Sequence, residues 1–160
     1  MADHLYSQKV RVRVNGLLVE EGKLLLVKIR HPTREVGIWM PPGGGIDFGE
    51  KMEDAVRREI LEETGVKVQV GDLRYIHEYI QPPLHAVEFY YDCYRIGGTA
   101  GLGHDPELPE TKQLLEEVCF VPLTEIAELP VVPEHIRWHF KEEHERNERF
   151  PKIISNKNLF

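Results

Sequence analysis

The stretch Gly44–Val66 constrains the fold of this chain most. A glycine-rich loop leads there into an expected helix, and the helix carries acidic residues on the side that should face the core. At about 100° per residue, Met52, Ala55 and Val56 form one apolar stripe along the helix. The stripe continues toward the end of the helix as carboxylates: Glu59, Glu62 and Glu63. The side of the helix that should be buried therefore begins as hydrocarbon and ends as a cluster of acids.

A cation would explain why acids gather on that side. Residues three or four apart on a helix have Cβ atoms roughly 5–6 Å apart, and like charges that close raise the pKa of one group unless a cation intervenes. Mg²⁺ binds carboxylate oxygens and keeps water and substrate phosphate as its other ligands. The pattern therefore predicts a metal site. The alternative is a solvated helix with ordinary charge pairs, which is how the other side of the helix looks: Glu53, Asp54, Arg57 and Arg58.

The same stretch fits a longer pattern, G-x5-E-x7-R-E-U-x-E-E-x-G-U, in which U is a bulky apolar residue. Every defined position is filled: Gly44, Glu50, Arg58, Glu59, Ile60, Glu62, Glu63, Gly65 and Val66. This pattern resembles the signature box of the Nudix hydrolases, the MutT-like family. The order of the flanking elements is also similar to that of the family, so we expect the resemblance to extend from about Val10 to His144.

The resemblance implies a fold and a reaction. The fold would be an α/β/α sandwich with a central mixed β-sheet. The reaction would be hydrolysis of the pyrophosphate linkage of a nucleoside diphosphate derivative, by attack of water on phosphorus. Mg²⁺ would be the cofactor, with Mn²⁺ as a substitute. The substrate would be a modified nucleoside triphosphate or a nucleotide sugar such as ADP-ribose. A homodimer is the assembly that the family suggests.

The resemblance also assigns roles within the box. The metal ligands would be the backbone carbonyl of Gly43 and the box glutamates: Glu59, Glu62 and Glu63. Glu50 would be a metal-associated carboxylate, although a charge that favours the helix N-terminus is the simpler role. Arg58 would orient one of the glutamates, because a guanidinium can hold a carboxylate through two parallel hydrogen bonds. All these residues except Gly43 form the expected catalytic set.

Residues outside the box are weaker candidates. Glu116 and Glu117 precede the last expected strand and would supply a general base or an extra metal ligand, or else form a solvated pair. Histidines in strands are alternative bases, although such residues are more often packed: His77 and His85. Cations before the box would meet phosphate or ribose, or be surface charges: Lys28, Arg30 and Arg34. Aromatic residues would stack on a base or belong to the core: Trp39, Tyr79, Phe89 and Tyr91.

Hydrophobic periodicity outlines a single domain, residues 1–150, followed by a loosely held tail, residues 151–160. Asn15-Gly16 and Glu21-Gly22 read as turns, and the segment Pro41–Gly45 is too rich in proline and glycine for regular structure. The expected strands are Val10–Val14, Lys23–Ile29, Val66–Val70, Leu73–Ile80, His85–Ile96 and Val118–Val121. The expected helices are Lys51–Thr64, which Gly65 ends, and Glu134–Arg149.

Composition limits the partners of the chain. The net charge of −7 disfavours broad nucleic-acid binding, which needs a basic face, and no apolar run approaches the ~18 residues of a membrane span. The N-terminal segment lacks the apolar core of a signal peptide, and the two cysteines, Cys93 and Cys119, have no metal or redox spacing. We therefore expect a protein of the reducing cytoplasm. The partner that the resemblance implies is a small nucleotide substrate. Two alternatives stay open. One is a silent nucleotide-sensing module, which would usually lose box glutamates; the other is an RNA 5′ pyrophosphohydrolase.

Overall fold

The computed structural model describes residues 9–30, 35–104, 106, 109–110 and 113–155. Within them, an eight-stranded mixed sheet runs in the order β3-β2-β1-β6-β5-β8, with β4 paired to β1 and β7 paired to β2. Its strands are β1 (Val10–Glu20), β2 (Lys23–Ile29), β3 (Ile38–Met40), β4 (Gly43–Gly45), β5 (Val66–Gln81), β6 (Leu84–Gly98), β7 (Leu115–Pro122) and β8 (Lys152–Ser155). The helical elements are α2 (Met52–Thr64), the short 3-10 helix η2 (Ile126–Glu128) and α3 (Glu134–Glu145).

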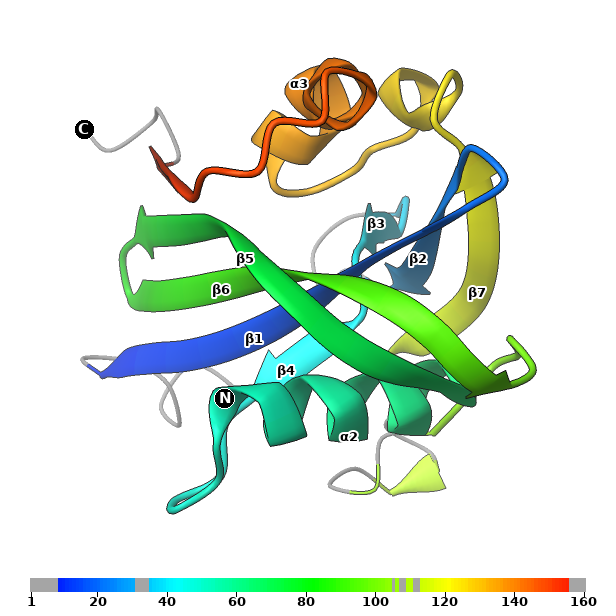
Figure 1. The fold of residues 1–160 in the computed structure, drawn as a ribbon. Coiled ribbons are helices and arrows are strands. Elements are labelled where there is room, and N and C mark those ends of the chain that lie inside the picture. The colour runs from blue at the N-terminus through cyan, green and yellow to red at the C-terminus, as the bar shows by residue number, and fades with distance from the viewer. Residues whose placement is uncertain (1–8, 31–34, 105, 107–108, 111–112, 156–160) are drawn as a thin grey trace.

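The sheet lies between the two α-helices, with α2 on one face and α3 on the other (Figure 1). This arrangement confirms the expected α/β/α sandwich. The pairs β1–β6 and β5–β8 are parallel, and the remaining pairs are antiparallel. None of the helices in the described part of the chain is long and apolar enough to cross a bilayer.

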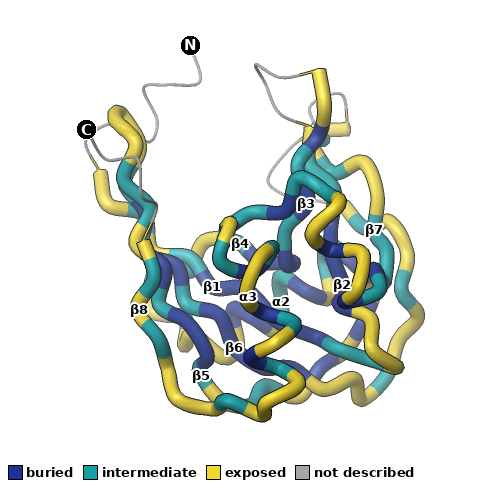
Figure 2. Tube along the Cα trace, turned by 90° about the horizontal axis from the view of Figure 1, so that it is seen from above, coloured by how far each residue is buried: buried dark blue, intermediate teal, exposed yellow. Residues whose placement is uncertain are grey.

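Alternation along β1 divides the core into two layers. Val14 and Leu18 point toward α2, where Ile60 is fully buried against them. Leu17 points the opposite way and packs in the layer of α3, whose Phe140 is also fully buried. Seen from the α3 side, buried segments of the sheet run beneath that helix (Figure 2). The apolar face of α2 packs on one surface of the sheet and that of α3 on the other, and this packing positions α2 on its side of the sheet.

Three expectations about local structure were wrong. Asn15-Gly16 is not a turn but the middle of β1, where a Cβ on Gly16 would lie 2.3 Å from Ile60 Cδ1. The glycine is therefore required by helix packing. Part of the segment Pro41–Gly45 is regular, because Gly43–Gly45 form β4 by pairing with β1. The two strands expected between Val66 and Ile80 are one strand, β5, with an irregular register between Val70 and Leu73.

The chain after α3 also differs from expectation. The helix ends at Glu145, and Lys152–Ser155 are not a loose tail but form β8 beside β5. Residues 156–160 of the expected tail lie outside the described residues. The ammonium of Lys152 holds the strand by donating a hydrogen bond of 2.7 Å to Glu143 Oε1. A pairing partner far away in the sequence decides this element, so local composition could not reveal it.

Glu143 ties α3 to two strands and makes stability depend on pH. Burial raises its pKa, but hydrogen bonds from Lys152, Tyr75 and His135 outweigh burial, and the pKa lies below the ordinary value. A carboxyl whose pKa is lower in the folded protein than in the unfolded chain stabilises the folded state. This contribution is complete above the unfolded pKa of about 4.3 and is lost as the pH falls through the pKa of the folded state. We therefore expect acid to lower the free energy of unfolding.

We expect Glu143→Gln to lower that free energy at pH 7 by about 1–3 kcal/mol and to flatten its dependence on pH below 4.3. Urea unfolding at pH 7 and at pH 3.5 measures both effects. Burial lowers the pKa of the neighbouring His135, which adds acid sensitivity of its own between the two pH values. An unchanged difference between wild type and variant at the two pH values would contradict this role of Glu143.

Candidate active site

The acidic end of α2 lies against the glycine strand β4. The backbone N–H of Gly43 donates a hydrogen bond of 3.0 Å to Glu63 Oε2. A Cβ on Gly44 would lie only 2.4 Å from Glu59 Oε1, so the carboxylate rests directly on the backbone of the strand. Both contacts exist because β4 pairs with β1 above the helix. The structure thus brings the predicted glutamates and Gly43 together.

Arg58 connects the carboxylates to one another. Its Nε and Nη2 hold both oxygens of Glu50, at 2.8 and 2.9 Å. Its Nη1 donates to Glu59 at 2.8 Å and to Glu62 at 3.3 Å, and Nη2 also reaches the carbonyl oxygen of Gly45 at 3.0 Å. The position of Arg58 on the helical wheel suggested a solvated face, but its long side chain bends back to the acids. It donates hydrogen bonds to three carboxylates, and the sequence suggested one.

Burial and Arg58 oppose each other in setting the charges of this cluster. Burial raises the pKa of Glu59, the guanidinium of Arg58 counteracts part of that rise, and the charge of Glu62 adds to it. The paired hydrogen bonds from Arg58 lower the pKa of Glu50. The bond to Glu50 in turn raises the pKa of Arg58 above its ordinary value. Glu50 is therefore the carboxylate most firmly held in its charged form by Arg58.

The donor set suits a hard divalent cation, because carboxylate and carbonyl oxygens are the ligands that Mg²⁺ prefers. Gly44 also provides a surface without a side chain, against which the carboxylate of Glu59 lies. In the described part of the chain, however, no group of three or more His, Cys, Asp or Glu side chains is arranged to hold a metal ion. The cation that the acids share in this arrangement is the guanidinium of Arg58.

The candidates outside the box lie elsewhere on the sheet. Glu116 on β7 accepts a hydrogen bond of 3.0 Å from Arg30 Nε, and Lys28 approaches the same carboxylate to 4.0 Å. Glu117 is exposed and lies opposite Lys28 in the strand register. Arg34 lies outside the described residues. The structure therefore pairs Glu116 with Arg30.

The aromatic candidates are mostly packed. Trp39 is 8% exposed and belongs to the core layer of α3, with the ammonium of Lys28 at 5.9 Å from its ring centroid. The hydroxyl of Tyr79 donates to the side chain of Gln81. Phe89 and Tyr91 pack in or against the core layer of α2. Trp39, Phe89 and Tyr91 are therefore arranged as in a core, the alternative considered for them, whereas the hydrogen bond of Tyr79 is exposed.

Sequence reasoning named His77 only as an alternative base and missed the polar group to which it belongs on the α3 face of the sheet. Arg13, Glu88 and His77 lie side by side on β1, β6 and β5. Their only local signal was the alternation of valine and arginine in β1, which reads equally well as a strand with one solvated side. Glu88 and His77 are 9% and 6% exposed, so this face is not solvated there.

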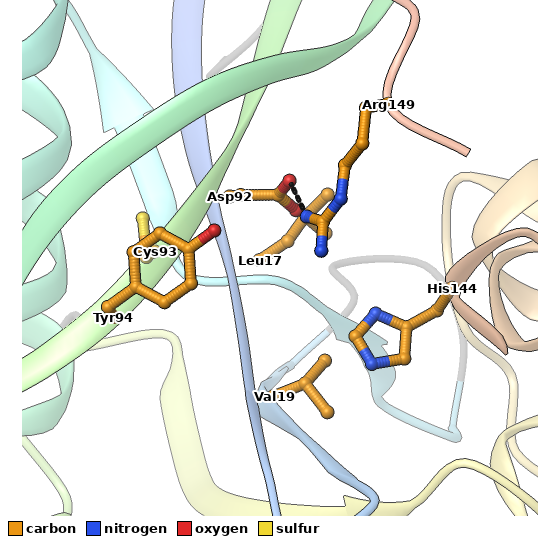
Figure 3. Close-up of a pocket in the computed structure, with 7 residues that line it drawn as sticks. All are labelled: Leu17, Val19, Asp92, Cys93, Tyr94, His144 and Arg149. Carbon is orange, nitrogen blue, oxygen red and sulfur yellow. Dashed lines mark hydrogen bonds and ion pairs between the residues drawn. The ribbon is translucent and has the colours of Figure 1, made fainter. Parts of the chain in front are cut away.

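A small pocket on the same face is a separate feature. It has a volume of about 50 Å³ and is lined by Leu17, Val19, Asp92, Cys93, Tyr94, His144 and Arg149. Figure 3 shows Arg149 reaching into it toward Asp92, with which it forms a hydrogen bond of 2.8 Å. Sites for drug-sized ligands have volumes of roughly 300–1,000 Å³. This pocket is therefore too small for a nucleotide, and it does not include the carboxylates of α2.

Comparison with known proteins supports the assignment of the fold and the box. The family model described as NUDIX domain matches residues 8–141. The chain is 29% identical over 129 residues to an ADP-ribose pyrophosphatase from Methanocaldococcus jannaschii, covering 79% of this chain and 73% of that protein. It is 37% identical over 72 residues to an RNA pyrophosphohydrolase from Erythrobacter litoralis, covering 45% of this chain and 43% of that protein.

A solved structure shows the same fold. The NUDIX hydrolase from Nitrosomonas europaea superimposes with a TM-score of 0.72 at 20% identity, covering 89% of this chain and 93% of that one. The family model covers most of the chain, and the carboxylates of its box meet on the glycine strand. The protein therefore belongs to the Nudix hydrolase family.

Proposed function

We propose that this chain is a divalent-metal-dependent pyrophosphohydrolase of nucleoside diphosphate derivatives, either a nucleotide sugar such as ADP-ribose or a modified nucleoside triphosphate. The observation that best supports this proposal is the carboxylate cluster beside β4, in which Glu59 and Glu62 accept hydrogen bonds from Arg58 and Glu63 accepts one from the N–H of Gly43. The relative from M. jannaschii, named as an ADP-ribose pyrophosphatase, matches over most of both chains and favours the nucleotide sugar.

The cluster would hold Mg²⁺ or Mn²⁺ through its glutamates and the carbonyl of Gly43. When bound, the metal would polarise phosphate oxygens and lower the pKa of a bound water. The residues of the chain set the positions of the charges. Arg58 ties Glu50 to the cluster, the N–H of Gly43 orients Glu63, and the bare backbone of Gly44 lets Glu59 lie close. Apart from Glu50, which lies in the loop before α2, these residues belong to a helix and a strand, elements that hold a site more precisely than loops do.

Two other activities make different predictions. An RNA 5′ pyrophosphohydrolase is suggested by the relative from E. litoralis, but that match covers less than half of either chain. The net charge of −7 also disfavours a broad nucleic-acid surface. A silent sensing module would bind nucleotides without turnover. The complete set of box glutamates favours catalysis, because a sensor has no need to keep a metal cluster.

A substrate panel tests the proposal. Purified protein is mixed with Mg²⁺ and, separately, ADP-ribose, an oxidised deoxynucleoside triphosphate and a 5′-triphosphorylated RNA oligonucleotide. We expect hydrolysis of ADP-ribose or of the triphosphate, loss of that hydrolysis in EDTA, and recovery with Mn²⁺. In ¹⁸O-labelled water, mass spectrometry should find the label on a phosphate product. Binding without turnover, turnover that resists EDTA, or a preference for the RNA would each refute the proposal.

A further inference from the structure

A row of polar residues crosses the α3 face of the sheet and ends at the glycine strand. In the strand register, Gly45 lies opposite Arg13, Arg13 beside Glu88, and Glu88 opposite His77. Residues directly opposite in a sheet point to the same face. The row therefore runs across β4, β1, β6 and β5 on the face away from α2. At β4 it reaches the strand whose other face carries the carboxylate cluster.

Glu88 organises this row. His77 Nδ1 lies 2.8 Å from Glu88 Oε2, and the hydroxyl of Tyr90 donates to the same oxygen at 3.1 Å. The guanidinium Nε of Arg13 lies 3.3 Å from Glu88 Oε1. Burial raises the pKa of Glu88, but His77 and Arg13 outweigh burial and keep it below the ordinary value. Glu88 is thus a buried, charged group that holds Arg13 by its Nε side.

The two terminal nitrogens of Arg13 have no hydrogen-bond partner among the described residues. The contact with Glu88, at 3.3 Å from Nε, is an ion pair without a hydrogen bond, and Arg13 makes no hydrogen bond and no other ion pair with the described residues. Space adjoins it, because a Cβ on the neighbouring Gly45 would have no atom within 4 Å. Arg13 also lies close enough to lower the pKa of Glu59 by its charge. Its free donors are therefore near both an opening and the carboxylates.

A second polar group at this position lacks a partner. Asn15 is the next residue of β1 on the α3 face and is fully buried, and neither its amide oxygen nor its amide nitrogen has a hydrogen-bond partner within the described structure. It packs against Gly43, since a Cβ there would lie 2.4 Å from Asn15 Oδ1. Buried polar groups almost always find a hydrogen-bond partner. Arg13 Nε and the amide of Asn15, at two successive positions of this face, have none within the described structure, which indicates that a group from outside it completes them.

We infer that Arg13 is a substrate-binding residue whose terminal nitrogens hold a phosphate of the nucleoside diphosphate, with Glu88 as its positioning residue. This inference rests on the proposed function for the nature of the substrate. A guanidinium offers two parallel N–H groups that match two phosphate oxygens. The phosphate would enter over Gly45, on the side of β4 opposite Glu59. The substrate would then be held from both faces of the glycine strand.

Binding measurements test this role without catalysis. The probe is α,β-methylene-ADP, whose bridge resists hydrolysis, with adenosine as the probe that lacks phosphate; both are titrated by calorimetry in the presence of EDTA. We expect Arg13→Gln to weaken the binding of α,β-methylene-ADP about 10- to 100-fold, which corresponds to the loss of a hydrogen bond between charged groups. The binding of adenosine should stay unchanged. Arg13→Lys keeps the charge without the fork and should recover only part of the affinity.

Arg11→Gln is the matched control, because Arg11 lies on the same strand and face, two residues further from β4. It should leave both affinities unchanged. Equal weakening of both probes by Arg13→Gln would assign Arg13 to the base and overturn the phosphate role. Unchanged binding together with a lower melting temperature would make the row purely structural. If wild type binds α,β-methylene-ADP but hydrolyses no substrate, the proposed function fails and this inference still stands.

Glu88→Gln tests the positioning role. It removes the charge that holds Nε of Arg13 but leaves the guanidinium in place. We expect a smaller loss of α,β-methylene-ADP affinity than with Arg13→Gln, and no further loss when the two changes are combined, because both act through one contact. Additive losses in the double variant would show that Glu88 acts independently of Arg13.

Discussion

Replacing Glu62 and Glu63 together by glutamine is expected to reduce turnover roughly 10³-fold while the protein stays folded. Removing one preorganised electrostatic contact in an active site typically costs about 10²–10³-fold, and here two neutral amides replace two charged oxygen donors. Neither side chain is part of the apolar core, which Ala55, Val56 and Ile60 of the same helix supply. The loss should therefore appear in kcat, with little change in the melting temperature.

The matched control is Glu53→Gln on the same helix. Glu53 is exposed and pairs with Arg57 at 3.5 Å on the side away from the cluster. Steady-state kinetics on the substrate that the panel identifies, together with thermal unfolding, compares the variants. Retained turnover in the Glu62/Glu63 variant would show that the carboxylates do not hold the catalytic metal. An equal loss in Glu53→Gln would point to a general effect of helix charge.

Adding a single methyl group at Gly44 is expected to produce the second-largest loss of turnover rate. In Gly44→Ala, the new Cβ would lie 2.4–2.6 Å from the carboxylate atoms of Glu59, which real contacts do not tolerate, so the carboxylate must move. Misplacing a catalytic group by about 1 Å can cost about 10²-fold in rate. The displaced atoms are the end of a flexible side chain, and we therefore expect stability to change little.

Two other glycines serve as comparisons. Gly101→Ala should change neither rate nor stability, because its Cβ would have no atom within 4 Å. Gly43→Ala should lower both, since its Cβ would lie 2.1 Å from the backbone oxygen of Val14, and a paired strand cannot yield as a side chain does. Kinetics and melting temperatures of the three variants separate the effects. A fully active Gly44→Ala enzyme would refute the tight placement of Glu59.

The sequence pattern predicted those elements that are determined by interactions between residues close together in the chain. Helix α2 was expected at Lys51–Thr64 and observed at Met52–Thr64, with Gly65 as its left-handed end at φ 73°. Helical periodicity, capping and a buried stripe all act within a few residues. The strand Lys23–Ile29 was also placed correctly, since its apolar run needs no knowledge of partners. The spacing of the box glutamates likewise placed them on one side of the helix.

Strands that form only by pairing with distant segments of the chain were not predicted from the sequence. Gly43–Gly45 become a strand only because β1 offers its backbone, and Lys152–Ser155 become one only because β5 does. Gly43–Gly45 has none of the β-branched or aromatic residues that mark a strand by composition, and Lys152–Ser155 has two isoleucines in a segment of only four residues. Backbone hydrogen bonds between segments far apart in the chain decide both cases.

The candidate site divides in the same way. Spacing along one helix was enough to name Glu59, Glu62 and Glu63 as a cluster, because neighbours on a helix are neighbours in space. Tertiary folding alone decided that Arg58 donates hydrogen bonds to three carboxylates and that Arg13 meets Glu88 and His77 in one row. Such contacts depend on which strands lie side by side and on how far a long side chain reaches, and no local spacing in the chain encodes either.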